Sequence, residues 1–478
     1  MSLTSRRDFV RTVAVGAVAA GMPGVLRGAS RHSMYGCLPP MRADGWDAVP
    51  EILARIKPPV FPDRAFDAGK FGAVADGMND CTEALQRAID ACHDAGGGKV
   101  NVPGGRVVTG PLRLRSNVNL VVKKGSTLVF TTDPRRFPIV LTRFEGVEVM
   151  SYMPLLYALD EENIAVTGEG TLDGGGNCMT WWPWKGATEC SLPDRHDQAK
   201  ARDRLFAMSE AGKAVNERQF GEGSYLRPSF VEPYRCKNVL IEGLTIVNSP
   251  MWVLHPTQCS NVTIRRVNVN SHGPNNDGVD VESCRDVLIE GCTFDTGDDC
   301  VVIKSGRNAD GRRLHAPSEN VVVRQCSMKD GHGGVSIGSE ISGDARRIYV
   351  DDCVMSSPNL ERAIRIKTNA MRGGVIEDIY VRNLRIGEVK IAVLDIDFNY
   401  EEGAKGPFMP TVRSIDMRDV TSQKSGNALY LRGFPAAQIA DVRLTSCTFA
   451  NVAKPDVIEN VKGLSLKDVS TNGKRVSK

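Results

Sequence analysis

Strand-like runs in which apolar and polar residues alternate recur along most of the chain, and nearly all begin with a small polar residue. From Asn238 onward these starts stand 22 to 36 residues apart, too long for a hexapeptide β-helix repeat. The runs are also too rich in β-branched residues and Gly for helical repeats. The pattern predicts an all-β fold, a right-handed parallel β-helix of about ten coils. The starts are Asn117, Asn163, Asn238, Asn261, Asp286, Asn320, Arg347, Asp378, Ser414 and Asp441, with outer ones near Val100 and Gly463.

An amphipathic helix is predicted immediately before the first repeats. Asp80 followed by Glu83 is the pattern of a capping box, and the helix that begins there ends at Gly96. We expect this helix to cover the N-terminal end of the solenoid, where strand edges and core would otherwise be exposed. A shorter helix is predicted near Val49 to Ile56. The apolar face of the first helix comprises Leu85, Ala88, Ile89 and Cys92.

Two residue types recur at fixed phases of the repeat. The Asn or Asp at each start is expected to form a stacked side-chain ladder in the turn. The chain has 13 Cys, so at least one thiol is unpaired. Parallel stacking points the Cβ atoms of equivalent residues the same way, so we predict inward ladders of mostly reduced Cys in preference to a disulfide framework. One ladder is Cys236, Cys259 and Cys284, and the other is Cys292, Cys326, Cys353 and Cys447.

Residues 1–30 have the pattern of a bacterial twin-arginine (Tat) export signal. Arg6 and Arg7 precede an apolar run from Thr12 to Leu26 that is too short and Gly-rich for a membrane-spanning helix. A short buried helix is the alternative interpretation. Because Tat signals are addresses and not anchors, we expect a periplasmic or secreted protein without a membrane anchor. Residues 31–64 are expected to form an N-terminal extension, and residues 65–478 one β-helix domain with an insertion at about 174–226.

Composition mainly excludes classes of partner. The net charge of +3 is too small to indicate nucleic acid or an anionic membrane as a partner, and 41% hydrophobic residues is ordinary for a globular protein. We expect a monomer that needs no cofactor and no metal ion. The insertion contains Trp181, Trp182 and Trp184, which could form either a small aromatic core or a wall that stacks against sugars.

Four polar clusters, each following a strand-like run, recur at a similar phase in consecutive repeats. Equal phase in neighbouring coils means contact in space, because stacked strands lie roughly 4.8 Å apart. Asp277 therefore falls beside Asp299, and His332 at the phase of Asp298. The clusters are Asn275 to Gly278, Gly297 to Cys300, Gly331 to Gly333, and Arg365 to Lys367, the last in phase with Val302 and Lys304.

Three carboxylates, an imidazole and two cations on one surface suit hydrolysis of a glycosidic bond in an acidic sugar. A protonated carboxyl donates to the leaving oxygen and a carboxylate activates water, typically roughly 6.5 to 9.5 Å apart for inversion. Crowding three acids raises at least one pKa, and Arg and Lys bind a substrate carboxylate. Each cluster alone is ordinary turn or surface chemistry. Four such clusters at matching phase are difficult to explain by a purely structural role.

With these motifs in order, the chain resembles the polygalacturonases of glycoside hydrolase family 28, which are right-handed parallel β-helices that hydrolyse the pectin backbone with inversion. The motifs Asn-x-Asp, Gly-Asp-Asp, Gly-His-Gly and Arg-Ile-Lys all stand in the clusters above, flanked by Ser249 to Trp252 and Ser336 to Glu340. Asn276 stands where Thr is frequent. The resemblance implies Asp298 as general acid, Asp277 and Asp299 as the water-activating pair, His332 as support for the acid's protonation, and Asn275, Arg365 and Lys367 as substrate-binding residues.

The mode of action and two rival functions stay open at this point. An open groove would permit internal cleavage, whereas the insertion, together with the similarity of Trp181 to Lys185 to bacterial exo-acting relatives, favours exo action on polygalacturonate or its oligosaccharides. A pectate lyase would share the fold but require Ca²⁺. A non-catalytic carbohydrate-binding solenoid would not need the acids. His255 is interpreted as a structural residue.

Overall fold

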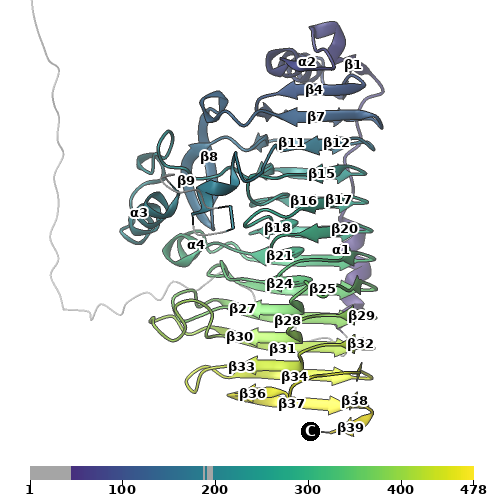
Figure 1. Cartoon of the computed structure of the whole chain (residues 1–478), viewed down its shortest axis with the longest axis vertical. Coiled ribbons are helices and arrows are strands. Elements are labelled where there is room, and N and C mark those ends of the chain that lie inside the picture. Colours follow the sequence, from purple (N-terminus) through teal and green to yellow (C-terminus); the bar gives the residue numbers. More distant parts are fainter. Residues whose placement is uncertain (1–44, 187–188, 191–196, 478) are drawn as a thin grey trace, which may run out of the picture. The chain divides into compact units, whose positions relative to one another are not determined.

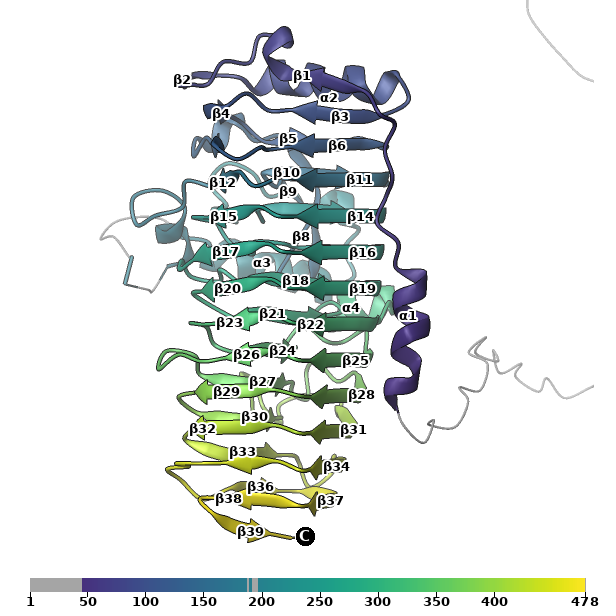
Figure 2. The same ribbon diagram turned by 90° about the vertical axis from the view of Figure 1, so that its right-hand side faces the viewer.

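The computed structural model describes residues 45–186, 189–190 and 197–477. Within residues 45–477, strands from successive turns of the chain stack in parallel and form three faces of a solenoid (Figures 1 and 2). This arrangement confirms the predicted parallel β-helix. Its longest all-parallel sheet holds 13 strands, so the stack is longer than the expected ten coils. The predicted export signal lies outside the described residues.

The first face is the 13-stranded sheet, and the second is a 14-stranded sheet that ends in one antiparallel strand. The first comprises β1 (Ala65–Asp67), β3 (Gly98–Asn101), β6 (Val118–Val121), β11 (Glu162–Thr167), β14 (Lys237–Glu242), β16 (Ser260–Arg265), β19 (Arg285–Glu290), β22 (Ser318–Arg324), β25 (Ala345–Asp351), β28 (Val375–Arg382), β31 (Thr411–Arg418), β34 (Ile439–Thr445) and β37 (Val461–Lys467). The second comprises β2 (Asp76–Asp80), β4 (Gly105–Thr109), β7 (Ser126–Phe130), β12 (Thr171–Asp173), β15 (Thr245–Val247), β17 (Asn268–Ser271), β20 (Thr293–Thr296), β23 (Ser327–Met328), β26 (Val354–Met355), β29 (Arg385–Glu388), β32 (Thr421–Lys424), β35 (Thr448–Phe449), β38 (Val469–Thr471) and β39 (Lys474–Val476).

The third face carries the predicted motifs. Its main part has seven strands, and isolated bridges continue it into a three-stranded sheet toward the N-terminus. The seven are β18 (Val279–Glu282), β21 (Val301–Lys304), β24 (Val335–Ile337), β27 (Arg362–Lys367), β30 (Ala392–Asp397), β33 (Asn427–Arg432) and β36 (Val457–Glu459), and the three are β13 (Val231–Tyr234), β10 (Leu156–Leu159) and β5 (Leu112–Arg113).

The turn ladder forms as predicted. Asn163 and Asn238 have φ of 56° and 58°, a left-handed conformation that Asn tolerates better than most residues. The Asn163 amide donates to Asn117 Oδ1 at 3.0 Å, and the Asn238 amide donates to Asn163 at 2.8 Å. Asn261 donates to Asn238 at 2.6 Å. Most repeat starts are therefore Asn or Asp, because the turn favours both a left-handed backbone and a side chain that hydrogen-bonds to a neighbouring coil.

The cysteines also follow the prediction. Ten are free and buried among the described residues, and the thiols of one ladder touch the next coil. The backbone N–H of Cys236 donates to Cys259 Sγ at 3.4 Å, and that of Cys259 donates to Cys284 Sγ at 3.2 Å. One disulfide, Cys178–Cys190, lies in the insertion and outside the repeats.

The N-terminal end is covered by α2 (Thr82–Asp94), as predicted, and its expected apolar face is buried. The capping box is wrong, because Asp80 is the last residue of β2 and the helix begins after Cys81. The Asp80 carboxylate instead accepts from the backbone N–H of Thr82 at 2.9 Å. The predicted short helix is α1 (Val49–Arg55), which lies along the first face (Figure 2).

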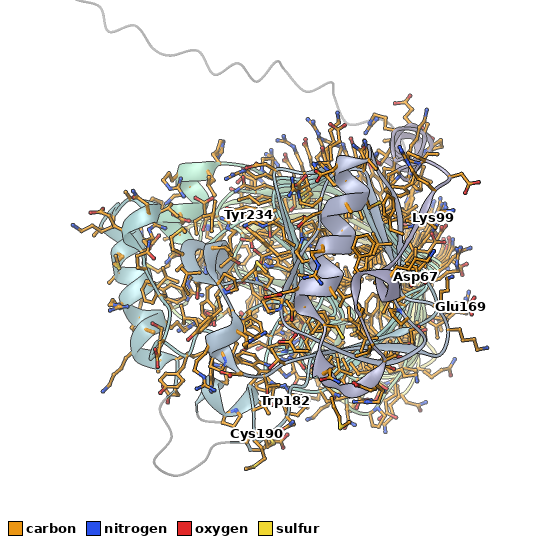
Figure 3. All side chains as sticks on the ribbon, turned by 90° about the horizontal axis from the view of Figure 1, so that it is seen from above. Asp67, Lys99, Glu169, Trp182, Cys190 and Tyr234 are labelled. Atoms are coloured by element: carbon orange, nitrogen blue, oxygen red, sulfur yellow. A yellow bond between two sulfur atoms is a disulfide. The ribbon has the colours of Figure 1, made fainter. Side chains whose placement is uncertain are left out.

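A satellite packs against the N-terminal half of the third face (Figure 1). We use this name for the hairpin β8 (Ile139–Phe144) and β9 (Val147–Tyr152), α3 (Ala199–Glu210) and α4 (Asn308–Leu314). Viewed along the stack, it lies beside the solenoid (Figure 3). Five 3-10 turns complete the described helices: Gly45–Ala48, Ala68–Phe71, Pro134–Arg136, Trp182–Lys185 and Val215–Glu217. The small core of the satellite comprises Phe144, Val147, Val149, Leu205, Phe220 and Leu226, with Met251 and Trp252 from the solenoid.

The third face bears charged residues that this covering buries. The guanidinium of Arg143, from β8, lies 3.1 Å from Glu282 Oε1 of β18, and both side chains are fully buried. No helix among the described residues is long and apolar enough to span a membrane.

Candidate active site

Strand pairing on the third face brings the predicted motifs together. Each motif stands in the turn before or within one of four consecutive strands, β18, β21, β24 and β27. Extended by two residues, the registers place Asp277 beside Asp299, and extended by three they place His332 beside Asp298, as the repeat phase predicts. The paired positions are Val279 with Val301, Val301 with Val335, Val335 with Ile364, and Ser336 with both Val302 and Arg365.

The three predicted aspartates form one cluster. One carboxylate oxygen from each of Asp277, Asp298 and Asp299 lies within 4.8 Å of the other two. Asp277 and Asp299 are buried, whereas the Asp298 side chain keeps 15% of its surface exposed. The spacing is shorter than the roughly 6.5 to 9.5 Å expected for an inverting pair, so the carboxyl groups interact strongly with one another.

Burial raises the pKa of the Asp277 carboxyl well above its usual range, and the neighbouring Asp298 carboxylate raises it further. Asp277 Oδ1 has no hydrogen-bond partner among the described residues. Burial alone would also raise the pKa of Asp298, but the hydrogen bond to His332 and the charges of His332, Lys367 and Lys304 together outweigh burial and lower that pKa. We expected crowding to raise at least one pKa, and of the three aspartates the one with the raised pKa is Asp277.

His332 and Asp298 form a proton-sharing pair. His332 Nδ1 lies 2.9 Å from Asp298 Oδ1, and the hydrogen bond raises the pKa of His332 to about 9. The backbone N–H of Asp299 donates to the same Asp298 oxygen at 3.0 Å. At neutral pH the pair holds a proton beside the exposed edge of the acid cluster.

Asp299 is fixed as a carboxylate by the two predicted cations. Lys367 Nζ donates to Asp299 Oδ2 at 2.7 Å, and a guanidinium nitrogen of Arg365 lies 3.5 Å from Oδ1. Burial opposes ionisation of Asp299, but the charges of Lys367 and Arg365 lower its pKa. The Ser336 hydroxyl donates to Oδ1 at 2.7 Å. A carboxylate that is already ionised can orient a water molecule and accept a proton from it.

A third cation near the acid cluster is Lys304, the last residue of β21, the strand that follows Asp299. Lys304 is buried beside the cluster, donates to Glu340 at 2.8 Å, and lies 3.7 Å from Asp280. Burial lowers the pKa of Lys304, but the charges of Glu340 and Asp277 raise it overall. Lys304 has the same phase as Lys367, so the repeat register could have identified it.

The cluster lines a cavity of about 380 Å³. All seven predicted site residues except buried Asp299 line it, and Asp299 reaches it through Lys367 and Arg365. The lining residues that come from outside the repeats were not predicted, because they have no position in the repeat pattern. These are Glu145 and Arg202 from the satellite, and Tyr400 and Glu401 from the loop after β30.

Asn275 and Asn276 have different roles. Asn275 lines the cavity, and its Oδ1 accepts from the buried Arg227 guanidinium at 2.8 Å. Asn276 is fully buried, and its amide donates to the carbonyls of Ser249 and Met251 at 3.2 and 3.1 Å. The residue that departs from the frequent Thr therefore supports the loop that carries Asp277.

The tryptophans of the insertion form a core. Trp181 is fully buried, with its ring centroid 4.9 Å from that of Trp184 and 5.4 Å from that of Phe137. The Trp182 indole N–H donates to the Ser249 carbonyl at 2.9 Å. Of the two interpretations left open by the sequence, the structure favours the aromatic core.

His255 is structural, as predicted. It is fully buried, and its two ring nitrogens lie 3.0 Å from Glu232 and 2.8 Å from Glu282. It is therefore held between two carboxylates beneath the satellite.

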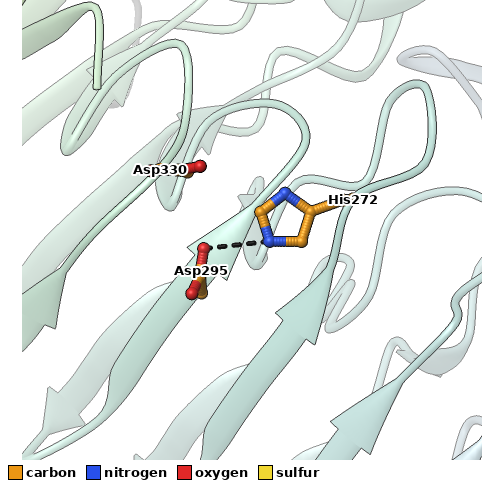
Figure 4. A group of neighbouring side chains, drawn as sticks. All are labelled: His272, Asp295 and Asp330. Atoms are coloured by element: carbon orange, nitrogen blue, oxygen red, sulfur yellow. Dashed lines mark ion pairs between the residues drawn. The ribbon is translucent and has the colours of Figure 1, made fainter. Parts of the chain in front are cut away.

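A second polar cluster lies outside the cavity, at the C-terminal ends of strands β17, β20 and β23 of the second face (Figure 4). His272 Nε2 pairs with Asp295 at 2.9 Å, and Lys329 lies 3.9 Å from the same carboxylate. Asp330 accepts from Asn359 at 3.1 Å and from Ser357. Because these side chains already have partners within the protein, we interpret the group as contacts between coils.

A parallel β-helix that presents crowded carboxylates beside carboxylate-binding cations defines the chain as a glycoside hydrolase. Residues 211–470 match the family model for glycosyl hydrolases family 28, and the chain belongs to that family.

Three similar proteins carry names of the polygalacturonase type. The crystal structure of a hyperthermoactive exopolygalacturonase from Thermotoga maritima is 43% identical, covers 90% of this chain and 97% of that one, and has a TM-score of 0.88. A probable polygalacturonase from Vitis vinifera is 28% identical over 83% of this chain and 77% of its own length. The exo-poly-alpha-D-galacturonosidase of Dickeya chrysanthemi is 25% identical over 84% and 68%.

Proposed function

We propose that the protein hydrolyses α-1,4-galacturonosyl linkages of polygalacturonate or its oligosaccharides and acts from a chain end. The observation that carries the proposal is the contact between Asp299 and both Lys367 and Arg365, because it places carboxylate-binding cations directly beside the crowded acids. A galacturonate carboxylate bound by these cations would hold its glycosidic bond over the cluster.

The proposed chemistry divides the site into an acid and a base. Asp298, exposed at the cavity, donates a proton to the leaving oxygen, and His332 supplies that proton through their shared hydrogen bond. Asp299, held ionised by Lys367, and Asp277 together bind the attacking water, and the ionised Asp299 accepts its proton. Attack by water in a single displacement inverts the anomeric carbon. The bond from the anomeric carbon to the leaving oxygen breaks, and the water oxygen replaces it.

The exo mode is supported by elements outside the solenoid that line the cavity. The satellite contributes Glu145 and Arg202 to its lining, and the loop after β30 contributes Tyr400 and Glu401. Glu145 of the satellite and Glu401 of that loop lie 3.7 and 3.5 Å from the same residue, Arg307. Elements outside the solenoid therefore meet beside the cavity and wall it there, which suits a chain end better than the middle of a polymer. The named exo-acting relatives from Thermotoga maritima and Dickeya chrysanthemi support the same mode.

Product analysis over time on polygalacturonate tests the proposal. We expect short products from the first minutes while viscosity falls slowly. Mixed oligomers with rapid viscosity loss would contradict the exo mode. Absorbance of an unsaturated product that disappears with chelator would indicate a lyase. Lys304, Lys367 and Arg365 around the carboxylates disfavour Ca²⁺ at the cluster.

We also propose that residues 1–30 direct export by the Tat pathway, on the basis of Arg6 and Arg7 and the apolar run that follows. Polygalacturonate is a cell-wall polymer too large to enter a cell intact, so an exported enzyme would meet it. Replacing Arg6 and Arg7 by Lys should leave the protein inside the cell, as measured by fractionation and activity.

A further inference from the structure

The cations that line the cavity differ in their partners. Six Lys and Arg side chains line it. In the described part of the chain, five of them have a carboxylate within 3.5 Å, whereas Lys185 has no ion-pair partner. The paired cations are Arg202 with Glu145, Lys304 with Glu340, Arg362 with Asp395, and Arg365 and Lys367 with Asp299.

Lys185 is held in place by its neighbours. It is the last residue of the 3-10 turn Trp182–Lys185, and it follows Trp184, whose carbonyl accepts from the backbone N–H of Gln198 at 2.8 Å. The Trp181 and Trp184 rings pack at a centroid distance of 4.9 Å. In sequence, the disulfide Cys178–Cys190 encloses this turn.

The same turn is tied to the catalytic loop. The Ser249 carbonyl accepts from the Trp182 indole at 2.9 Å and from the Asn276 amide at 3.2 Å. Asn276 immediately precedes Asp277. The turn that carries Lys185 and the loop that carries Asp277 therefore share one support, so the fold fixes the backbone of Lys185 relative to the cleavage point.

We infer that Lys185 is a specificity-determining residue that binds the carboxylate of the sugar on the insertion side of the scissile bond. This inference rests on the proposed function. Every galacturonate unit carries one carboxylate, and Arg365 with Lys367 accounts for one of them. A half-buried lysine that lines the same cavity and has no ion-pair partner in the described ranges is the group that matches the next carboxylate along the substrate.

The test compares Lys185→Gln with Lys185→Arg, using trigalacturonate and its fully methyl-esterified form. Loss of a charge-assisted contact should raise KM for trigalacturonate about 10-fold or more in Lys185→Gln while kcat changes less than about 3-fold. Lys185→Arg should restore most of the affinity. The preference for the free acid over the ester should fall by the same factor in Lys185→Gln, because the ester carries no charge for Lys185 to bind.

Lys200→Gln is the matched control, because Lys200 is an exposed lysine of α3 that does not line the cavity. It should leave KM unchanged. The thermal unfolding midpoints of all variants are measured beside the wild type, and Lys185→Met replaces Lys185→Gln if the latter does not fold.

Unchanged KM in Lys185→Gln, or a fall in kcat without a change in KM, would overturn the inference and leave the proposed function standing. A wild-type protein that fails to hydrolyse trigalacturonate and polygalacturonate would overturn both. The wild-type measurement thus separates the two failures.

Discussion

Two stacks of polar side chains run along this solenoid, and both arise from the same repeat. In the turn ladder each Asn amide donates to the amide oxygen of the preceding coil, at distances of 2.6 to 3.0 Å. In the active-site cluster the stacked groups are carboxylates within 4.8 Å of one another. An amide has a donor and an acceptor, so identical amides satisfy each other; identical carboxylates repel and need outside donors.

The difference shows what each stack is for. The ladder is neutral and hydrogen-bonded, so it stabilises the turns. The acid cluster leaves Asp277 Oδ1 and both oxygens of Asp280 without hydrogen-bond partners among the described residues. Unpartnered buried polar groups reduce stability, and such groups persist where function requires them. The comparison predicts that changes in the ladder affect folding and that changes in the cluster affect turnover.

The largest effect is expected for Asp298→Asn. An amide cannot donate an acidic proton, so kcat should fall by about 10² to 10⁴, with the unfolding midpoint unchanged within a few degrees. Asp295→Asn is the matched control, because Asp295 lies on β20 of the same coil but outside the cavity. It should retain wild-type kcat. Equal kcat in both variants would remove the distinction between the stacks.

His332→Gln should reduce kcat/KM at pH 7 by roughly 10- to 100-fold, because Asp298 loses the neighbour that supplies its proton. The wild-type rate should fall as pH rises through about 9, where His332 loses its proton, and the variant should lack that limb. A pH profile of kcat/KM measures both.

The stability effect of His332 has the opposite pH dependence to that of a carboxylate whose pKa is lowered on folding, such as Asp299. Its pKa is raised on folding, so the imidazolium stabilises the fold below pH about 6.5 and the contribution is lost as pH rises through about 9. His332→Gln should therefore be destabilising at pH 6 and nearly neutral at pH 10. In the kinetic experiment, an alkaline limb of kcat/KM that persists in His332→Gln would exclude His332 as the origin of that limb.

Asn261→Ala tests the ladder. The change removes the bonds to Asn238 and Lys57 and puts Ala at φ 56°, which should cost about 2 kcal/mol of unfolding free energy. Asn261→Gly keeps the left-handed turn and should cost about half as much. Denaturant unfolding measures the free energy, and kcat/KM should not change. A loss of activity without a loss of stability would contradict the structural role.

Asp277→Asn should have the smallest effect on stability, an increase of about 1 kcal/mol at pH 7. Burial and Asp298 raise the pKa of Asp277 on folding, so the wild type is penalised as pH rises above about 3.9, where the unfolded carboxyl ionises. The gain should vanish near pH 3, as denaturant unfolding at both pH values would show. A destabilised variant at pH 7 would mean that Asp277 is better satisfied than its surroundings indicate.

Repeat phase made the fold and most of the site predictable. Strand runs, ladder starts and the positions of Asp277, Asp298 and Asp299 all follow from one spacing, because parallel stacking converts equal phase into contact. The satellite could not be placed in this way, since Glu145 and Arg202 reach the cavity from segments without a repeat. The capping box failed at Asp80 because β2 extends to that residue, which no local pattern revealed.

The proposed reaction is a single displacement by water at the crowded acids, and the anomer that forms first distinguishes it from a double displacement. Proton NMR of polygalacturonate or trigalacturonate during the first turnovers should show the β-anomer of the new reducing end, which later mutarotates. The carboxyl groups of inverting glycosidases are typically roughly 6.5 to 9.5 Å apart, whereas one oxygen of each aspartate here lies within 4.8 Å of the other two. The anomer therefore tests inversion independently of the spacing. The α-anomer as first product would require a covalent intermediate and would contradict the roles assigned to Asp277 and Asp299.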